Sequence, residues 1–344
     1  MDKRNIIVIG ASAGGFEAIK QLVSDLPADL DATIFIVWNM SPDVRGILPH
    51  VINKLGKLKA THALDREKFI RKHIYVAPPD HHLLLENDMV RVTHGPKENL
   101  FRPAIDPLFR SAAFAYGPRV IGVILSGALD DGVAGLWAIK QQGGLAIVQD
   151  PMDAEVSSMS TNAINAVHVN HIVPVKEMGT LLTQLVQEQA PANIENIDHE
   201  RTEVEVRIAM DQQMSQKKIF DYGELTPYTC PECHGVLTAL HEGDRIRFRC
   251  HTGHAFSADS LLAGITGYVE ETLWNALRSV QESILLLNHM GDHFAEANQP
   301  KIAAMYFKKA RDANRLADTL REATFNHEQL NTDNIRDQAN EGAN

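Results

Sequence analysis

Ser12 lies in the stretch IIVIGASAGGFEAI, which begins at residue 6. The apolar run predicts a buried strand, and the helical pattern after it predicts a sharp strand-to-helix turn at the serine. Such a turn can present a hydroxyl as a nucleophile, and the free N–H groups at the helix start can stabilise an oxyanion. The alternative without chemistry is a tight turn whose small residues only allow close packing.

The same turn could also hold a pyrophosphate, because glycines allow close backbone approach and a helix start attracts negative charge. Gly10, Gly14 and Gly15 do not have the GxGxxG spacing of that motif. The next predicted strand, TIFIVWNM, ends without the acid that binds a ribose. The sequence therefore favours acyl transfer over nucleotide binding.

A carboxylate that could serve this site follows another apolar run, in VIGVILSGALDDGVAG. Asp130 and Asp131 come after the predicted strand, and the carboxyl ends of parallel strands meet at one edge of a sheet. One of the two could orient a base for Ser12, and one could cap the helix that follows. These roles are compatible for adjacent residues.

The three cysteines indicate a second kind of chemistry, since all lie in CPECHGVLTALHEGDRIRFRCHTGH, from residue 230. An odd number in one short region argues against a disulfide framework, and this thiolate and imidazole spacing is typical of a structural zinc site. The predicted ligands are Cys230, Cys233, Cys250 and His254, the last favoured over His251 because the chain can curl back after Cys250. Inert core cysteines are the alternative.

The composition is that of a soluble globular chain. Of the 344 residues, 44% are hydrophobic and 22% charged, enough for one large core and a second unit. The net charge of -11 argues against a general nucleic-acid or anionic-membrane binder, which needs a basic surface. No apolar stretch approaches the ~20 residues of a membrane helix, and the N-terminus has no signal-peptide pattern. We therefore expect a cytoplasmic protein with no membrane insertion.

Apolar runs alternate with helical patterns in the first part of the chain. This alternation predicts an α/β fold, a doubly wound and mostly parallel sheet with helices on both faces. The segments HLLLE and MVRVTH predict a hairpin added to that sheet. Helices are expected to begin near Phe16, Asp43, Asp106, Val133 and Lys176.

The chain is expected to have five parts. The α/β domain takes residues 1–189, and polar residues 190–227 predict a linker with one short helix at most. A zinc-ribbon-like module follows over 228–256 and needs its metal to fold, because it is too small to bury a core. Apolar stripes at helical spacing predict a helical hairpin over 257–325, and residues 326–344 a flexible tail.

Four segments in this order, IGASAGG, APPDHHLLLE, RPAIDPLFRSAA and GVILSGALDDGVAGL, resemble the CheB family of chemotaxis protein-glutamate methylesterases over residues 5–188. That family consists of serine hydrolases that remove methyl groups from chemoreceptor glutamates, and its members often also deamidate receptor glutamines. The resemblance implies that Ser12 is the nucleophile, that Asp131 is the triad carboxylate, and that N–H groups at Ala13 and Gly14 form part of the oxyanion hole. The chain is similar to a stand-alone form without a receiver domain, and many such forms carry a similar ribbon and helical hairpin.

Two positions depart from the family. In VWNMSPD, Asn39 stands where the strand end normally supplies the triad histidine, and Phe101 stands where a histidine commonly precedes the arginine. An amide has no nitrogen that titrates near neutral pH, so Asn39 cannot accept the serine proton. Losing the base of a serine triad costs on the order of 10⁴ to 10⁶ in turnover.

Three explanations are open: another histidine serves as the base, the chain is a degenerate esterase that still binds its partner, or the residue was changed to trap a substrate. His81 and His82 are the candidate bases, with solvated hairpin residues as the alternative. Arg102 can clamp a substrate carboxyl through its bidentate fork, or pair with Asp106 as a structural residue.

We therefore expect a protein-glutamate methylesterase, with glutamine deamidation as a further reaction, that acts through Ser12 on the cytoplasmic helices of methylated chemoreceptors. The competing hypothesis is a catalytically degenerate adaptor that docks on receptor helices or on a receptor methyltransferase. Zinc is the expected structural metal, and no cofactor is expected for catalysis.

Overall fold

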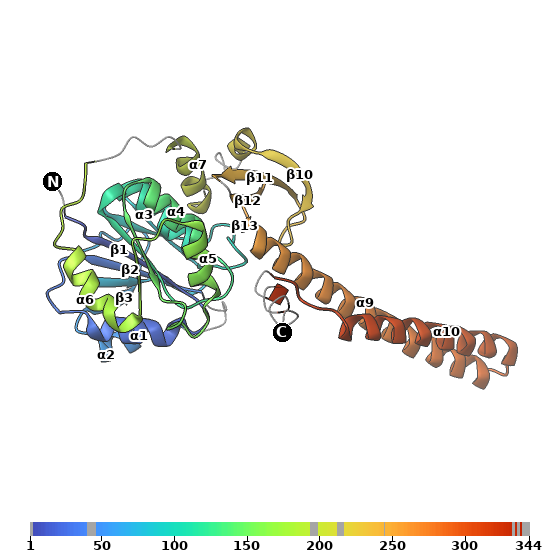
Figure 1. The fold of residues 1–344 in the computed structure, drawn as a ribbon. Helices are drawn as coiled ribbons and strands as arrows, with labels where there is room; N and C mark the ends of the chain where they lie inside the picture. Colours follow the sequence, from blue (N-terminus) through green and yellow to red (C-terminus); the bar gives the residue numbers. More distant parts are fainter. Residues whose placement is uncertain are drawn as a thin grey trace. The chain divides into compact units, whose positions relative to one another are not determined.

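The computed structural model describes residues 3–39, 46–192, 199–211, 217–243, 245–331, 334–335 and 338. The chain forms two compact units, Met1–Leu261 and Leu262–Asn344. The first unit holds an α/β domain and a small antiparallel sheet, and the second is dominated by two long helices (Figure 1).

A seven-stranded sheet forms the centre of the α/β domain, with the strand order β3-β4-β2-β1-β7-β8-β9. All its neighbouring strands run parallel, which confirms the predicted doubly wound parallel sheet. The strands are β1 (Ile6–Ala11), β2 (Thr33–Trp38), β3 (Lys59–His62), β4 (His73–Val76), β7 (Val120–Ile124), β8 (Leu145–Gln149) and β9 (His171–Val173).

Helices cover both faces of this sheet (Figure 1). Alternate side chains of β1 point to opposite faces, so Ile7 and Ile9 belong to one core and Ile6 and Val8 to the other. Because both faces are buried, the strands read as continuous apolar runs. The first core includes residues of α1 (Gly15–Asp25), α2 (Leu48–Leu55) and α6 (Val175–Leu185), and the second includes residues of α3 (Ile105–Tyr116), α4 (Val133–Gln141) and α5 (Ser158–Ala166).

The structure differs from the sequence-based expectation in three local features. β3 and α5 were not expected, because the short edge strand KATH has no apolar run and α5 has weak apolar periodicity. The expected hairpin of β5 (His82–Glu86) and β6 (Met89–Thr93) forms a separate two-stranded sheet and does not extend the large one. The helix start expected near Asp43 lies outside the described residues.

A helix, α7 (His199–Ala209), lies in the segment where a polar linker was expected, and a 3-10 helix, η2 (Lys217–Tyr222), follows it. Val206 and Ala209 of α7 pack with Leu84 of the hairpin, and Ile208 packs with Leu240 of β11. Glu205 on the same helix is also buried. Charged residues such as this one gave the α7 sequence the pattern of a solvent-exposed segment. This segment therefore packs as part of the first unit.

A four-stranded antiparallel sheet, called here the cysteine-rich sheet, follows η2 in the order β10-β11-β12-β13. The CPEC turn joins β10 to β11, and the segment after Cys250 joins β12 to β13. Its strands are β10 (Glu224–Thr229), β11 (Val236–Glu242), β12 (Arg245–Cys250) and β13 (Ala255–Ser257).

The two long helices are α9 (Ala258–Glu296) and α10 (Pro300–Phe325), and they pair antiparallel as expected. Trp274 near the middle of α9 contacts Phe325 at the end of α10, with ring centroids 6.0 Å apart. Phe294 and Tyr306 stack at the other end, with centroids 5.3 Å apart. Among the described residues, none of the helices combines the length and apolar content that a membrane span requires.

Candidate functional site

Ser12 lies directly after β1, at the turn into α1, and is 7% exposed. Gly14 precedes α1 with φ of 70°, a left-handed conformation that glycine adopts at little steric cost. The Ser12 carbonyl accepts hydrogen bonds from Gly15 N at 2.9 Å and from Trp38 Nε1 at 3.1 Å. The backbone N–H of Ser12 donates to Ser126 O at 3.0 Å. Bonds from three segments therefore fix the backbone that carries the hydroxyl.

Two N–H groups at this turn can bind an oxyanion. Ser126 Oγ donates to Ala13 O at 2.8 Å, and this bond orients the planar peptide between Ala13 and Gly14. The bonds to Ser12 O orient the preceding peptide in the same way. Within the described ranges, the N–H groups of Ala13 and Gly14 donate no hydrogen bond, so both are available to a negatively charged oxygen.

The Asp131 carboxylate is buried after β7 and accepts hydrogen bonds from several N–H groups. Its Oδ2 lies 2.9 Å from Asn39 Nδ2 and 2.7 Å from Ile105 N. Its Oδ1 lies 2.9 Å from Asn99 Nδ2 and 3.4 Å from Asp106 N. The two backbone donors belong to the first turn of α3, so the positive end of that helix faces the carboxylate.

Two acidic groups lie close together here. Burial, followed by the neighbouring Asp106 carboxylate, raises the pKa of Asp131 to about 7, although its hydrogen-bond donors act in the opposite direction. Burial also raises the pKa of Asp106, whose Oδ2 and Oδ1 accept hydrogen bonds from Asn99 Nδ2 at 2.9 Å and from Gly135 N at 2.6 Å. Perturbed carboxyl groups of this kind cluster at functional sites.

Asn39 directly follows β2 and lies at the same carboxyl edge of the sheet as Ser12 and Asp131. Its N–H donates to Ala11 O at 2.9 Å, which places it beside Ser12 in the sheet. Its Nδ2 donates to Asp131, and its Oδ1 is buried with no hydrogen-bond partner in the part of the chain that the structure describes. Ser12, Asn39 and Asp131 thus follow three adjacent strands, β1, β2 and β7.

His82 has a structural role in the fold. Its Nε2 donates to Pro96 O at 2.9 Å, and its Nδ1 accepts from Ala104 N at 3.2 Å, so both ring nitrogens are occupied. Burial lowers the pKa of His82 to about 4. The ring is neither a solvated hairpin residue nor available to take the serine proton.

His81 also bonds elsewhere, with its Nδ1 2.9 Å from Pro79 O and its ring packed against His94. Across the described ranges, no histidine ring forms a hydrogen bond with the Ser12 hydroxyl. Among the residues that the structure describes, no imidazole is therefore identified as a replacement base.

Arg102 forms an ion pair that the sequence did not indicate. Its Nε donates to Asp80 Oδ1 at 2.9 Å and its guanidinium also donates to Gly95 O at 2.9 Å. Burial raises the pKa of Asp80, but hydrogen bonds from Arg102 and His94 outweigh it and bring that pKa below its ordinary value. Pairing with Asp106, the structural alternative considered from the sequence, does not occur.

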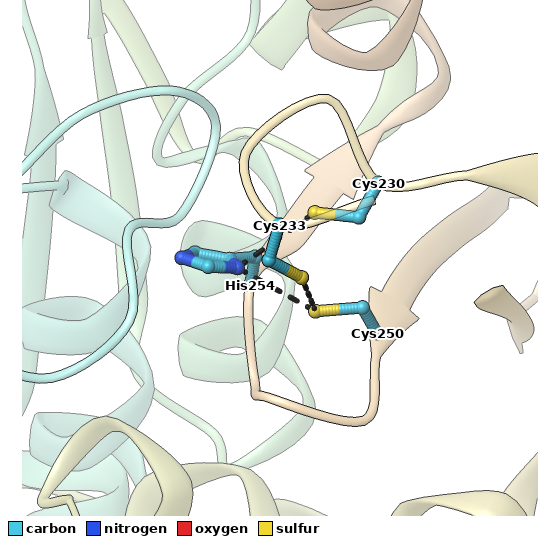
Figure 2. A group of neighbouring side chains, drawn as sticks. All are labelled: Cys230, Cys233, Cys250 and His254. Carbon is cyan, nitrogen blue, oxygen red and sulfur yellow. Dashed lines mark hydrogen bonds between the residues drawn. The ribbon is translucent and has the colours of Figure 1, made fainter. Parts of the chain in front are cut away.

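Figure 2 shows a second group of converging side chains, called here the thiol cluster: Cys230, Cys233, Cys250 and His254. Their ligand atoms all lie within 4.8 Å of one another. The Sγ atoms of Cys233 and Cys250 are 3.6 Å apart, and His254 Nδ1 lies 3.5 Å from Cys250 Sγ. Tetrahedral zinc with bonds of about 2.3 Å separates two sulfur ligands by about 3.7 Å, so the cluster fits this metal.

His251 is outside the cluster. Its ring lies against the backbone at Gly235, where an added Cβ would meet Cε1 at 2.4 Å, and the residue is exposed. His254, directly before β13, brings its Nδ1 to the three sulfurs because the chain folds back after Cys250, and so offers the fourth possible ligand atom.

Three residues that contribute to the first site were not singled out from the sequence: Trp38, Asn99 and Ser126. Asn99 is 32 residues from Asp131 in sequence, and Ser126 is 113 residues from Ala13. Each of these residues contacts a segment that is distant in the sequence, so no spacing within one segment could have indicated it.

A parallel α/β sheet with a serine, an amide and a buried acid at one carboxyl edge defines this chain as an α/β protein with a hydrolase-like site. A family model for "CheB methylesterase" matches residues 7–182. This chain belongs to the CheB methylesterase family.

Individual relatives agree with this assignment. A Leptospira interrogans protein named "Putative protein-glutamate methylesterase/protein-glutamine glutaminase" is 40% identical over 53% of this chain and 94% of that protein. The Salmonella typhimurium protein-glutamate methylesterase/protein-glutamine glutaminase is 35% identical over 52% of each chain. The crystal structure of the Thermotoga maritima CheB methylesterase catalytic domain matches 54% of this chain and all of that domain, with a TM-score of 0.52 and 29% identity.

Proposed function

We propose that this chain is a protein-glutamate methylesterase whose substrates are the methylated cytoplasmic helices of chemoreceptors. Ser12 Oγ attacks the ester carbonyl, and the N–H groups of Ala13 and Gly14 bind the oxygen that becomes negative. The carbon–oxygen bond to the methoxy group breaks, and this group leaves as methanol with the proton that the Ser12 hydroxyl has lost. Water then hydrolyses the glutamyl-serine ester, which gives a glutamate carboxyl group and restores the Ser12 hydroxyl. A glutamine side chain follows the same path with ammonia as the leaving group.

The observation that carries this proposal is the convergence of Ser12, Asn39 and Asp131 at the ends of three adjacent strands. Asn39 does half of what a triad histidine does, because Nδ2 donates to the acid while Oδ1 is an acceptor without a partner among the described atoms. An amide oxygen does not take up a proton near neutral pH. We therefore infer turnover on the order of 10⁴ to 10⁶ below that of a site with histidine.

Asn39 also favours a second candidate function, a non-catalytic adaptor of CheB shape. Its amide satisfies the buried Asp131 carboxylate without creating a base. Such a chain would bind receptor helices, or a receptor methyltransferase, and would not release methanol.

A methyl-release assay on methylated receptor separates the two functions. The unaltered chain, Ser12→Ala and Asn39→His are compared at equal concentration. Slow release that Ser12→Ala abolishes and Asn39→His raises supports the esterase. Release by Asn39→His alone, with receptor binding retained by the unaltered chain, supports the adaptor. If no variant releases methanol, the esterase proposal is wrong.

We further propose that residues 1–189 carry the reaction and that the thiol cluster binds a structural zinc ion within residues 228–256. The closed set of three sulfurs and one imidazole leaves no ligand position for a substrate, so the metal would stabilise the fold and would not itself contact the ester.

A further inference from the structure

The last strand of the cysteine-rich sheet, β13, hydrogen-bonds to the loop that precedes α3. Ala255 N donates to Lys97 O at 3.2 Å, and Ala255 O accepts from Asn99 N at 2.8 Å. The Asn99 side chain is held from the same side, because its Oδ1 accepts from Ser257 N at 3.0 Å and from Ser260 Oγ at 3.1 Å. The 97–99 loop and β13 are therefore one hydrogen-bonded unit.

The amide nitrogen of Asn99 binds Asp131, the carboxylate proposed to orient the base. Asn99 Nδ2 donates to Asp131 Oδ1 and to Asp106 Oδ2, each at 2.9 Å. Asn99 is 3% exposed, and its φ of 50° is one that asparagine tolerates better than most residues. If β13 moved away, the amide would lose the partners that fix its rotation and its Nδ2 could turn from both carboxylates.

A second series of contacts starts at the thiol cluster. Gly253 lies between the cluster residues Cys250 and His254, and its carbonyl accepts from Arg249 Nη1 at 2.7 Å. The Arg249 side chain is fully buried, and its Nη2 donates to Glu98 Oε1 at 2.9 Å. Glu98 is the neighbour of Asn99 in the chain, so the cluster turn is tied to the 97–99 loop through a buried ion pair.

We propose that the cysteine-rich sheet positions the catalytic acid: metal bound by the thiol cluster holds β13 against the 97–99 loop, and Asn99 then keeps Asp131 oriented for the reaction. The catalytic part of this proposal rests on the proposed function. Asn99 is a positioning residue, because it acts through Asp131. The competing explanation is that the cysteine-rich sheet packs on the α/β domain for stability alone. That explanation does not require one amide, Asn99, to bond both β13 and Asp131.

Hydrogen exchange of the full chain tests the mechanical link without any activity. Backbone amides are followed with zinc bound, after removal of zinc by a chelator, and after zinc is added back. The expected result is that the amides of Asn99 and Ile105 exchange at least tenfold faster without zinc and recover with it, while β1 and β8 keep their rates.

Two exchange results overturn the proposal. One is faster exchange in the cysteine-rich sheet with no change at residues 97–106. The other is faster exchange everywhere, including β1 and β8, which would indicate a general stabilising role. A purified chain that binds no zinc also overturns it, because the metal would then hold nothing.

A kinetic comparison in the Asn39→His background tests the catalytic link. Asn99→Asp keeps the Oδ1 acceptor for β13 but replaces the Nδ2 donor, and is expected to lower kcat about 100-fold with KM within twofold. Asn53→Asp is the matched control, because Asn53 bonds Ala60 through the same two amide atoms far from the site. Equal losses in both variants, or a loss confined to KM, would contradict positioning.

The two measurements also separate this proposal from the proposed function. If Asn39→His releases no methanol, the esterase function fails, and the exchange experiment alone decides whether zinc and β13 hold the 97–106 segment.

Discussion

Asn39 Nδ2 donates a hydrogen bond to Asp131 Oδ2 over 2.9 Å, which joins the ends of β2 and β7 across the strand that carries Ser12. A histidine in this place would donate to the acid with one nitrogen and accept the serine proton with the other. The amide reproduces only the donation. The contact between the strand-end residue and the acid is therefore present, but it involves no atom that can take up the serine proton.

In the Asn39→His background, Asp131→Asn should lower methyl release about 10⁴-fold, because an amide at that position cannot hold the correct imidazole tautomer or stabilise its charge. Asp130→Asn is the matched control. Asp130 accepts from Ser257 Oγ at 2.6 Å, which an amide oxygen can also do, so the loss should stay below about tenfold. Rates are measured on methylated receptor, and equal losses would show that Asp131 is not the orienting acid.

Asp131→Asn should also change how stability depends on pH. Burial raises the pKa of Asp131 to about 7, so the folded chain keeps this proton from about pH 4 to 7 while the unfolded chain has released it. The group therefore costs stability as pH rises through that window. Asp131→Asn removes the cost, and the variant should gain stability relative to the unaltered chain as pH rises from about 4 to about 7, by at most about 1.4 kcal/mol per pH unit. Urea unfolding at several pH values measures this, and a pH-independent difference would contradict it.

Glu98→Gln should destabilise the first unit by about 3–5 kcal/mol, since it leaves buried guanidinium groups without their carboxylate. Burial raises the pKa of Glu98, but Arg110 and Arg249 outweigh it and bring the pKa to about 2. The stability from this ion pairing is present above about pH 4.5 and is lost as pH falls toward 2.

Glu232→Gln is the control for Glu98→Gln, because Glu232 pairs with Lys97 at 3.0 Å with both side chains partly exposed. Its cost should be below about 1 kcal/mol. Denaturant midpoints at pH 7 compare the two variants, and similar costs would mean that the buried network contributes no more than a surface pair.

Cys233→Ser should abolish binding of one zinc equivalent per chain, and His251→Ala should leave it intact. Of the two residues changed here, Cys233 contributes a ligand atom to the thiol cluster, whereas the exposed His251 ring lies outside it. Metal analysis of the purified variants measures both. Zinc retained by Cys233→Ser, or lost in His251→Ala, would contradict the ligand assignment.

Much of the α/β domain could be predicted from local pattern. The strand–turn–helix around Ser12 and the apolar strand before Asp131 are short segments, and their periodicity depends only on neighbours in the chain. The C-x-x-C spacing likewise predicted a group of thiols that the fold brings together with His254. The edge strand β3 was missed, and the short helix allowed for residues 190–227 was not expected to pack on the first unit. In both cases burial depends on what packs against the segment and not on an apolar pattern of its own.

The sequence by itself determined that a serine follows a buried strand, that an amide ends the next strand where the CheB family has a histidine, and that three cysteines lie within one short region. Only the tertiary structure decided that His82 is buried and occupied on both nitrogens, that Arg102 pairs with Asp80, and that Asn99 links β13 to Asp131. Hydrogen bonds and ion pairs depend on distances of a few ångström between residues far apart in sequence, and such distances exist only once the chain has packed.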